Sequence, residues 1–286
     1  MYEDYRKFNI QSRPCIICGV TLAENSELWA QDAYFEALKC NSCGGVQVEP
    51  CLNQQGLDLY YSTYLNHRLS EEKKFEQRRV QYLQDAAFLE RYRTCGKVLD
   101  VGCSGGFFLN ALSNRFEKSG IEIDTDAARY AREQFGLDVA AETLGRDSLT
   151  ESSYDIVMFR GVIEHILDPK SAIKRATELL KPEGSIFICA TPNLRSFCAH
   201  AYRSKWNLWH PIQHINIFDV ETLHKMAGKD RFLIEAVDYP YLGTPYENEE
   251  QDYQSIMSDL KSKAIDRKSP PFWGNMLSVL FTLNSN

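Results

Sequence analysis

The sequence predicts an α/β protein with a doubly wound, mostly parallel sheet and a small cysteine-rich module in front of it. Three observations lead to this prediction. Strand-like and helix-like segments alternate from about residue 95 onward. One of these strands runs into a Gly-rich turn and straight on into a helix. Two Cys-x-x-Cys pairs lie within the first 50 residues.

The first 94 residues divide into two parts. Residues 1–56 carry only short hydrophobic segments, so a bound metal is expected to supply stability that apolar burial cannot. Residues 57–94 are rich in long charged and aromatic side chains, and Gly and Pro are absent from 57–93. This composition predicts one or two connecting helices.

Residues 95–286 are predicted to form the main domain. Strands are expected at 97–101, 137–140, 154–159 and 184–190, with another ending at 120–123, and helices at 109–112, 127–135 and 169–180. Further on, a helix is expected at 220–227, a strand at 232–237 and an acidic, then Pro-containing, mobile lid at 240–271. Residues 276–283 predict an antiparallel edge strand, with a short amphipathic helix as the alternative.

Charge and hydropathy exclude some classes of function. The net charge of −7 lacks the positive surface that nucleic-acid binding needs, which disfavours nucleic acid as a partner. No apolar run approaches the ~20 residues of a membrane span, and the N-terminus lacks the apolar core of a signal peptide. We therefore expect a cytoplasmic protein, in which paired cysteines indicate metal binding instead of disulfides. The sequence does not indicate an oligomeric state.

The segment from Val98 to Leu109 predicts a cofactor loop. Glycines after a buried strand let the backbone pass close to a ligand, and the following helix N-terminus presents free N–H groups. A plain tight turn is the alternative. An adenosine-containing ligand also needs an acceptor for its ribose hydroxyls about 20 residues further on, where Glu122 stands. Asp124 and Asp126 compete for this role, although Asp124 or Thr125 is better placed to cap the next helix.

Taken together, these segments resemble the class I S-adenosylmethionine-dependent methyltransferases, whose sheet is Rossmann-like. The first motif of that family resembles Asp100-x-Gly102-x-Ser104-x-Gly106, and the second resembles Gly120-Ile121-Glu122. Three later segments also resemble the family. Residues 154–157 match its fourth strand, residues 162–169 match the "EH" segment after that strand, and residues 179–185 match the turn before its fifth strand. Ser104 replaces a usual glycine, so Gly105 is expected to supply the flexibility of the loop.

The resemblance also implies roles in cofactor binding. Asp100 would position the amino-acid end of S-adenosylmethionine through the loop, and Glu122 would hold the ribose. The backbone of Gly102, Cys103, Ser104 and Gly106 would pass beside the cofactor. Ile123, Thr143 and Leu144 would lie on or near the adenine, and Arg160 and Gly161 would border the methionine portion. Tyr60, Tyr61 and Tyr64 are interpreted as core residues of a helix or as a cover over the cofactor.

The cysteine pairs predict a zinc site. Cys15 and Cys18 are separated by 21 residues from Cys40 and Cys43, a spacing close to that of tetrahedral Cys₄ sites. A redox dithiol is the rival interpretation of one pair, but two pairs in tandem favour zinc. Four thiolates leave no position open, so the metal would be structural. Such a module before this domain resembles a bacterial subgroup that modifies sugars, small metabolites or surface glycans.

Three histidines are the candidate catalytic bases. Transfer of a methyl group to a hydroxyl or an acidic C–H releases a proton, and histidine titrates in the suitable range. His165, His210 and His214 qualify because the resemblance places their segments on the substrate side of the sheet. Each has a structural alternative, and residues 196–218, dense in aromatics and imidazoles, are expected to wall the acceptor pocket.

The sequence therefore predicts a methyltransferase that modifies an oxygen or carbon of a small molecule, such as a nucleotide-linked sugar, a glycan precursor or a secondary metabolite. An NAD-dependent oxidoreductase is one alternative, although Gly102-x-x-Gly105-Gly106 does not form Gly-x-Gly-x-x-Gly. A non-catalytic zinc protein that binds the cofactor is another.

Overall fold

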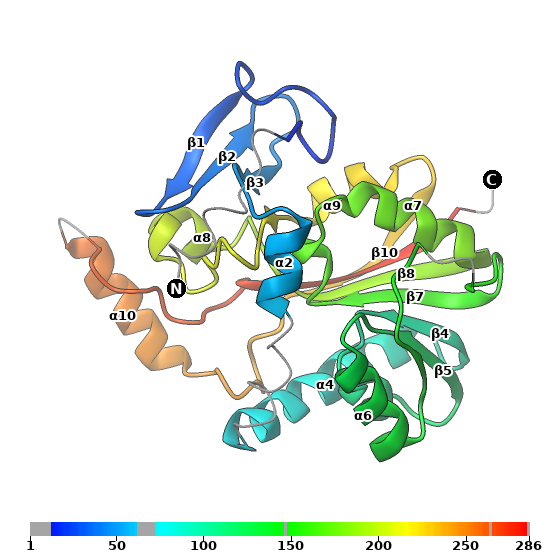
Figure 1. The fold of residues 1–286 in the computed structure, drawn as a ribbon. Coiled ribbons are helices and arrows are strands. Elements are labelled where there is room, and N and C mark those ends of the chain that lie inside the picture. Colours follow the sequence, from blue (N-terminus) through cyan, green and yellow to red (C-terminus); the bar gives the residue numbers. More distant parts are fainter. Residues whose placement is uncertain (1–12, 62–71, 146–147, 263–264, 285–286) are drawn as a thin grey trace.

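The computed structural model describes residues 13–61, 72–145, 148–262 and 265–284. A seven-stranded sheet forms its centre (Figure 1). The strands of this sheet are β4 (Gly96–Val101), β5 (Phe116–Ile121), β6 (Asp138–Ala140), β7 (Tyr154–Arg160), β8 (Leu180–Pro192), β10 (Phe232–Asp238) and β11 (Met276–Leu283). Their spatial order is β10-β11-β8-β7-β4-β5-β6. The pairs among β4 to β8 are parallel, which confirms the predicted mostly parallel sheet.

The last strand lies where the sequence did not place it. β11 is antiparallel, as predicted, but the expectation of an edge strand was wrong, because β11 pairs with both β8 and β10. Residues 277–281 are almost completely buried, so both faces of β11 are covered. The edge on this side of the sheet is β10, in which only Phe232 and Ala236 are buried.

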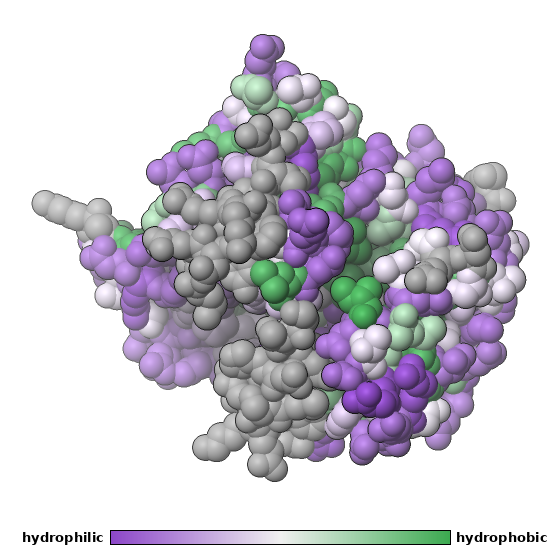
Figure 2. All heavy atoms as spheres, viewed as in Figure 1, coloured by the Kyte–Doolittle hydropathy of each residue, from purple (hydrophilic) through white to green (hydrophobic). Residues whose placement is uncertain are grey.

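Helices cover both faces of the sheet. They are α4 (Glu72–Tyr92), α5 (Phe107–Ala111), α6 (Thr125–Phe135), α7 (Pro169–Leu179) and α9 (Val220–Ala227). Figure 1 shows α7 and α9 on one face and α4 and α6 on the other. Successive strand residues point to opposite faces, so Val157 packs with the α7 and α9 side while Ile156 and Met158 pack with α4 and α5. The outer surface around α6 and α7 is mainly hydrophilic (Figure 2).

The chain order reverses between β4 and β7. From β4 the chain continues to β5 and β6 on one side, and β7 and β8 lie on the other. In open α/β sheets, ligands bind beyond the carboxyl ends of the strands at this point of reversal. The loops that follow β4 and β7 are therefore the place where a site is expected.

The N-terminal module is built into the rest of the fold. Its strands are β1 (Ser26–Gln31), β2 (Glu36–Cys40) and β3 (Val46–Val48), and β3 pairs with β9 (Asn216–Ile217) from the segment expected to wall the acceptor pocket. Trp29 of β1 lies 6.4 Å from Trp206 and 6.2 Å from Trp209 between ring centroids. The module and this segment consequently share one hydrophobic cluster.

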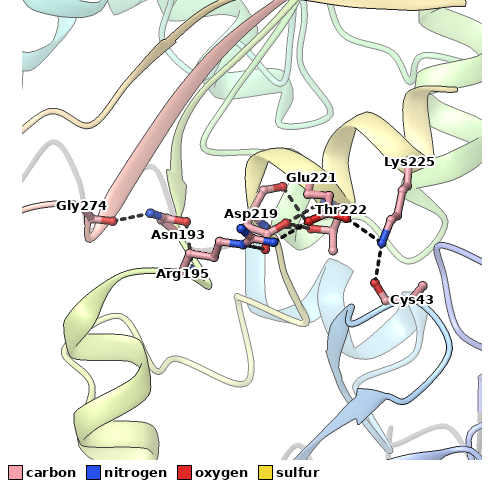
Figure 3. Close-up of polar contacts among 8 residues, drawn as sticks. All are labelled: Cys43, Asn193, Arg195, Asp219, Glu221, Thr222, Lys225 and Gly274. Atoms are coloured by element: carbon pink, nitrogen blue, oxygen red, sulfur yellow. Dashed lines mark hydrogen bonds and ion pairs between the residues drawn. The ribbon is translucent and has the colours of Figure 1, made fainter. Parts of the chain in front are cut away.

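Polar contacts also join the module to the main sheet (Figure 3). Lys225 of α9 donates to the backbone oxygen of Cys43 at 3.1 Å and pairs with Glu221 at 3.1 Å. Arg195, just after β8, pairs with Glu221 at 2.5 Å and with Asp219 at 2.8 Å. The loop of the second cysteine pair is thus tied through α9 to the end of β8.

The described residues also form further helical segments. They are α2 (Gln54–Tyr61), the 3₁₀ turns η2 (Ile163–His165) and η3 (Arg203–Lys205), α8 (Phe197–Tyr202) and α10 (Glu249–Lys261). Tyr202 donates to Asp259 at 2.6 Å, and Ile256 is buried in the cluster around Trp29, so α10 packs beside α8. A lid role for 240–271 stays a prediction. Of the helices in the described ranges, none combines the length and apolarity needed to cross a membrane.

Trp29→Ala tests whether the module stabilises the whole chain. Removing this buried ring should lower the free energy of unfolding by ~3–5 kcal/mol, because it leaves a cavity between module and main domain. Chemical denaturation measures the change. Leu28→Ala, at a neighbouring residue that is 52% exposed, is the control and should change little. Equal effects of the two substitutions would contradict the inferred docking.

Candidate functional site

The loop after β4 has a backbone that two glycines make possible. The N–H groups of Gly102 and Cys103 both donate to the Ile121 oxygen, at 2.8 and 3.1 Å. Gly102 and Gly106 have φ values of 70° and 76°, where a side chain is strained. A Cβ on Gly106 would lie 2.6 Å from a methyl group of Leu137 and 2.9 Å from the Cβ of Ala131, so helix α6 packs directly on the loop.

Ser104 adopts the left-handed conformation itself, with φ of 51°, whereas Gly105 does not. Gly105 instead leaves room for the Phe107 ring, which a Cβ would approach to 2.8 Å, and its flexibility stays a prediction. Glu122 explains how a serine is tolerated, because its Oε2 accepts the Ser104 N–H at 2.8 Å. Its Oε1 accepts from Asp124 N at 2.9 Å, so the carboxylate braces the loop from the end of β5. The Asp124 carboxylate caps α6, as predicted.

Asp100 is a buried acid at the end of β4. Its side chain is 2% exposed, and its Oδ1 has no hydrogen-bond partner among the described residues. Burial raises the pKa of Asp100 to about 8, with a further rise from Glu122 and an opposing effect of Arg160. A buried polar atom without a partner is unusual and is expected where a polar ligand completes the site.

Arg160, at the end of β7, is held by the connecting helix. Its guanidinium pairs with Asp85 of α4 at 2.8 Å and lies 4.2 Å from the Tyr82 ring centroid. Sequence reasoning assigned Arg160 to the methionine portion of a cofactor and missed Asp85. The available signal was helical spacing, because Asp85 shares a buried face with Tyr82 and Leu89. Gly161 follows with φ of 60°, and its N–H donates to Cys189 O.

The residues expected beside an adenine follow the carboxyl ends of two neighbouring strands. Ile123 follows β5 and Thr143 and Leu144 follow β6, and these two strands pair in parallel. Ile123 is 54% exposed, Thr143 is exposed and Leu144 is partly buried. Cys103 is buried, and that burial raises the pKa of its thiol, so it is not a thiolate nucleophile at neutral pH.

The three candidate histidines lie in a row. The ring centroids of His165 and His214 are 5.2 Å apart, and those of His214 and His210 are 5.5 Å apart. Burial lowers the pKa of His214 well below its usual value, and desolvation followed by Lys268 lowers that of His210. Both rings are therefore neutral at physiological pH, the state in which imidazole accepts a proton or binds a metal.

Glu164, beside this row, received no role from the sequence. It is 1% exposed, and burial raises its pKa to about 8. The nearby hydroxyl of Thr191 favours the charged form of Glu164, but the two side chains are not aligned for a hydrogen bond. Tyr61 of α2 reaches His165 Nδ1 at 2.9 Å, and Tyr60 contacts Gln213. Tyr64 lies outside the described residues.

The four cysteines of the module converge. Cys15 Sγ lies 3.4 Å from Cys43 Sγ, and Cys18 Sγ lies 3.7 Å from Cys40 Sγ. All four sulfur atoms lie within 4.8 Å of one another. Thiolates at ~2.3 Å from a tetrahedral zinc ion are about 3.8 Å apart, so this cluster has the size of a zinc site.

Comparisons with known proteins identify a family for the chain. A methyltransferase domain family matches residues 61–231. A ubiquinone biosynthesis O-methyltransferase from Methylococcus capsulatus is 34% identical over 98 residues, which are 32% of this chain and 41% of the relative. The chain thus spans less than half of that relative.

Solved structures share the fold at low sequence identity. An S-adenosylmethionine-dependent methyltransferase from Thermotoga maritima has a TM-score of 0.58 at 19% identity, covering 79% of this chain and 100% of that one. An N-methyltransferase from Bradyrhizobium japonicum, solved with S-adenosyl-L-homocysteine, has a TM-score of 0.50 at 12% identity, covering 79% and 98%.

Fold and loop are those of the class I methyltransferases. The family match extends over more than half of the residues, from the end of α2 to just before β10. The chain belongs to the methyltransferase domain family, a family of enzymes.

Asp100→Asn should change how stability depends on pH. Between pH 4 and 8 the folded protein keeps a proton on Asp100 that the unfolded chain has released, so this residue lowers stability as pH rises. The free energy of unfolding of the wild type should therefore fall more steeply from pH 5 to 8 than that of Asp100→Asn, by up to ~1 kcal/mol per pH unit.

Chemical denaturation at several pH values measures the two slopes. Asp230→Asn removes an exposed carboxylate and serves as the control, with the wild-type slope expected. Parallel slopes for the wild type and Asp100→Asn would show that Asp100 is ionised in the folded protein.

Proposed function

We propose that the chain is an S-adenosylmethionine-dependent methyltransferase acting on a hydroxyl oxygen of a small molecule. The observation that carries the proposal is the Glu122-braced glycine loop at the point where the strand order reverses. Membership of the methyltransferase domain family supports the reaction type. The relative named for O-methyl transfer supports oxygen over carbon as the acceptor atom.

The residues around the loop fit the cofactor. The loop packs tightly at the sheet edge, because a Cβ on Gly102 would lie 2.9 Å from Val162 and a Cβ on Gly106 would lie 2.6 Å from Leu137. Glu122 has a negative charge and lone pairs left after bracing the loop, as a ribose diol requires. The unpartnered oxygen of Asp100 suits the amino-acid end through a polar contact. Arg160, committed to Asp85, would border the site without being free to move into it.

S-adenosylmethionine supplies an electrophilic methyl group. In the reaction, the methyl carbon–sulfur bond breaks, a carbon–oxygen bond forms and the acceptor hydroxyl loses its proton. The protein must therefore orient the acceptor and favour the loss of that proton. His165 and His214 lie after β7 and in the neighbouring 196–218 segment, on the side where the acceptor would enter. The low pKa of His214 makes it a weak base, so His165 is the better candidate of the two.

The acceptor is proposed only as a small molecule with a hydroxyl group. The sequence led us to expect a nucleotide-linked sugar or glycan precursor, whereas the relative above is named for ubiquinone biosynthesis. Residues 196–218 would wall the acceptor pocket, but Trp206 and Trp209 are buried against Trp29 and serve packing.

We also propose that Cys15, Cys18, Cys40 and Cys43 bind a structural zinc ion. The separations of their sulfur atoms support this, as does the left-handed glycine after each pair, with φ of 80° at Gly19 and 82° at Gly44. The ion would replace the thiol protons of a module whose own core is small.

Calorimetric titration tests the cofactor. S-adenosylmethionine and S-adenosylhomocysteine should bind and NAD should not, and Glu122→Gln should weaken S-adenosylhomocysteine binding at least about tenfold, because a charged acceptor is lost. Glu117→Gln, an exposed residue of the same strand, is the control. Binding of NAD alone would support the oxidoreductase. Cofactor binding without turnover on a broad acceptor panel would support the non-catalytic protein.

Metal analysis after dialysis tests the zinc site. The double substitution Cys15→Ser and Cys18→Ser should remove about one zinc ion per chain, because half of the ligand set is lost. Cys95→Ser changes an exposed cysteine outside the cluster and should retain the metal. Equal zinc content in the double variant and the control would reject the site.

A further inference from the structure

A second group of potential metal ligands lies beside the proposed cofactor site. Glu164 and His165 belong to η2 after β7, and His214 comes from the segment before β9. One ligand atom from each of the three lies within 4.8 Å of the others, and His165 Nε2 is 3.7 Å from Glu164 Oε1. Ligands held at ~2.1 Å by one ion are about 3–4 Å apart, so small side-chain movements would bring all three to a metal.

Backbone carbonyls orient both histidines. His165 Nδ1 lies 2.6 Å from the oxygen of Gln213, and His214 Nδ1 lies 2.8 Å from the oxygen of Leu208. A carbonyl oxygen only accepts, so in each neutral ring Nδ1 carries the hydrogen and Nε2 carries the lone pair. Metal-binding histidines are held in this way, with the second ring N–H donated to a carbonyl or carboxylate.

Glu164 gives independent support. Its side chain is almost fully buried, and within the described part of the chain its Oε2 has no hydrogen-bond partner. Burying a carboxylate oxygen without a partner is costly, and an ion is one of the few ways to offset that cost. The same group therefore joins two pre-oriented imidazoles and one carboxylate whose Oε2 has no hydrogen-bond partner among the described residues.

We propose that Glu164, His165 and His214 bind a divalent transition-metal ion. Two imidazoles and one carboxylate favour Mn²⁺, Fe²⁺ or Zn²⁺ over Mg²⁺ and Ca²⁺, which prefer oxygen ligands. Three protein ligands leave coordination positions for a small molecule. The site differs from the cysteine cluster in its ligands and in its place, beside β7 instead of β2.

The site also suggests a class of acceptor, an inference that rests on the proposed function. An octahedral ion with three protein ligands has open positions for a hydroxyl and a second oxygen on the neighbouring carbon, which together can chelate it. A metal lowers the pKa of a hydroxyl that binds it, so the proton can leave to water before the methyl group is transferred. His165 and His214 would then act as ligands instead of bases.

Titration with Mn²⁺ followed by electron paramagnetic resonance tests the site. Thiolates select soft ions such as Zn²⁺, so Mn²⁺ is expected to count the histidine site alone. The wild type should bind about one Mn²⁺ per chain, and Glu164→Gln and His214→Gln should each weaken binding at least about tenfold. His200→Gln, at an exposed histidine of α8, should bind as the wild type does.

Two outcomes overturn the proposal. The first is that the wild type binds no Mn²⁺ up to about 1 mM, a concentration well above ordinary dissociation constants. The second is that the wild type and both ligand variants bind Mn²⁺ with equal affinity. A wild-type circular dichroism spectrum and a wild-type unfolding transition show that a variant is folded. A change of the Mn²⁺ spectrum on adding pyrocatechol but not phenol supports the acceptor class, and identical responses reject it.

The metal site and the methyltransferase function can fail separately. Stoichiometric Mn²⁺ binding that depends on Glu164 and His214, in a protein that does not bind S-adenosylmethionine, would sustain the metal site and reject the proposed function. S-adenosylmethionine binding without any Mn²⁺ binding would do the reverse.

Discussion

The buried ion pair between Arg160 and Asp85 fixes the rest of the candidate site. It joins the end of β7 to helix α4, which in turn packs on the loop after β4 through Tyr82 and Phe107, whose ring centroids are 6.1 Å apart. Removing one partner of such a pair typically costs 3–5 kcal/mol, because the other charge stays buried. The Arg160 guanidinium thus helps to hold helix α4 against its face of the sheet.

That cation is surrounded by more acids than it can neutralise. Arg160 pairs directly with Asp85, and it lowers the pKa of Asp100 and Glu164 only in part, since burial raises both to about 8. Among the described residues, each of these two carboxyls keeps one oxygen without a hydrogen-bond partner. Asp100 lies at the end of β4 and Glu164 in the turn after β7, the two strands between which the chain order reverses. Of these three acids, only Asp85 pairs directly with the Arg160 guanidinium.

The cysteine module contributes to the same region. β3 pairs with β9, and Arg13 donates to Val48 O at 2.9 Å and lies 3.4 Å from Asn216 Oδ1, so the module fixes the backbone that follows His214. Asn216 also donates to Ile166 O at 2.7 Å, next to η2. A metal that stabilises the module would therefore also hold the two segments that bring His165 and His214 together. Residues on both sides of the predicted boundary at residue 56 thus pack in one hydrophobic cluster.

The sequence by itself determined the features that depend on near neighbours. The glycine loop, Glu122 at the end of the next strand, the Asp124 cap and the strand and helix order all follow from local periodicity and backbone preference. The Cys-x-x-Cys pairs were equally visible, because the two cysteines of each pair lie on one turn. The left-handed Ser104 was missed, since its stability comes from a hydrogen bond to Glu122, in another strand.

Only the tertiary structure decided what depends on pairing between distant segments. The internal position of β11, the partnership of Arg160 with Asp85 and the approach of His214 to Glu164 join residues whose separation in the chain carries no periodic signal. Burial is the physical reason for these pairings. An unpaired charge is costly inside the protein, so a buried charged group is stable only where the fold brings a partner close to it. The sequence contains these residues, but the folded sheet determines which of them meet.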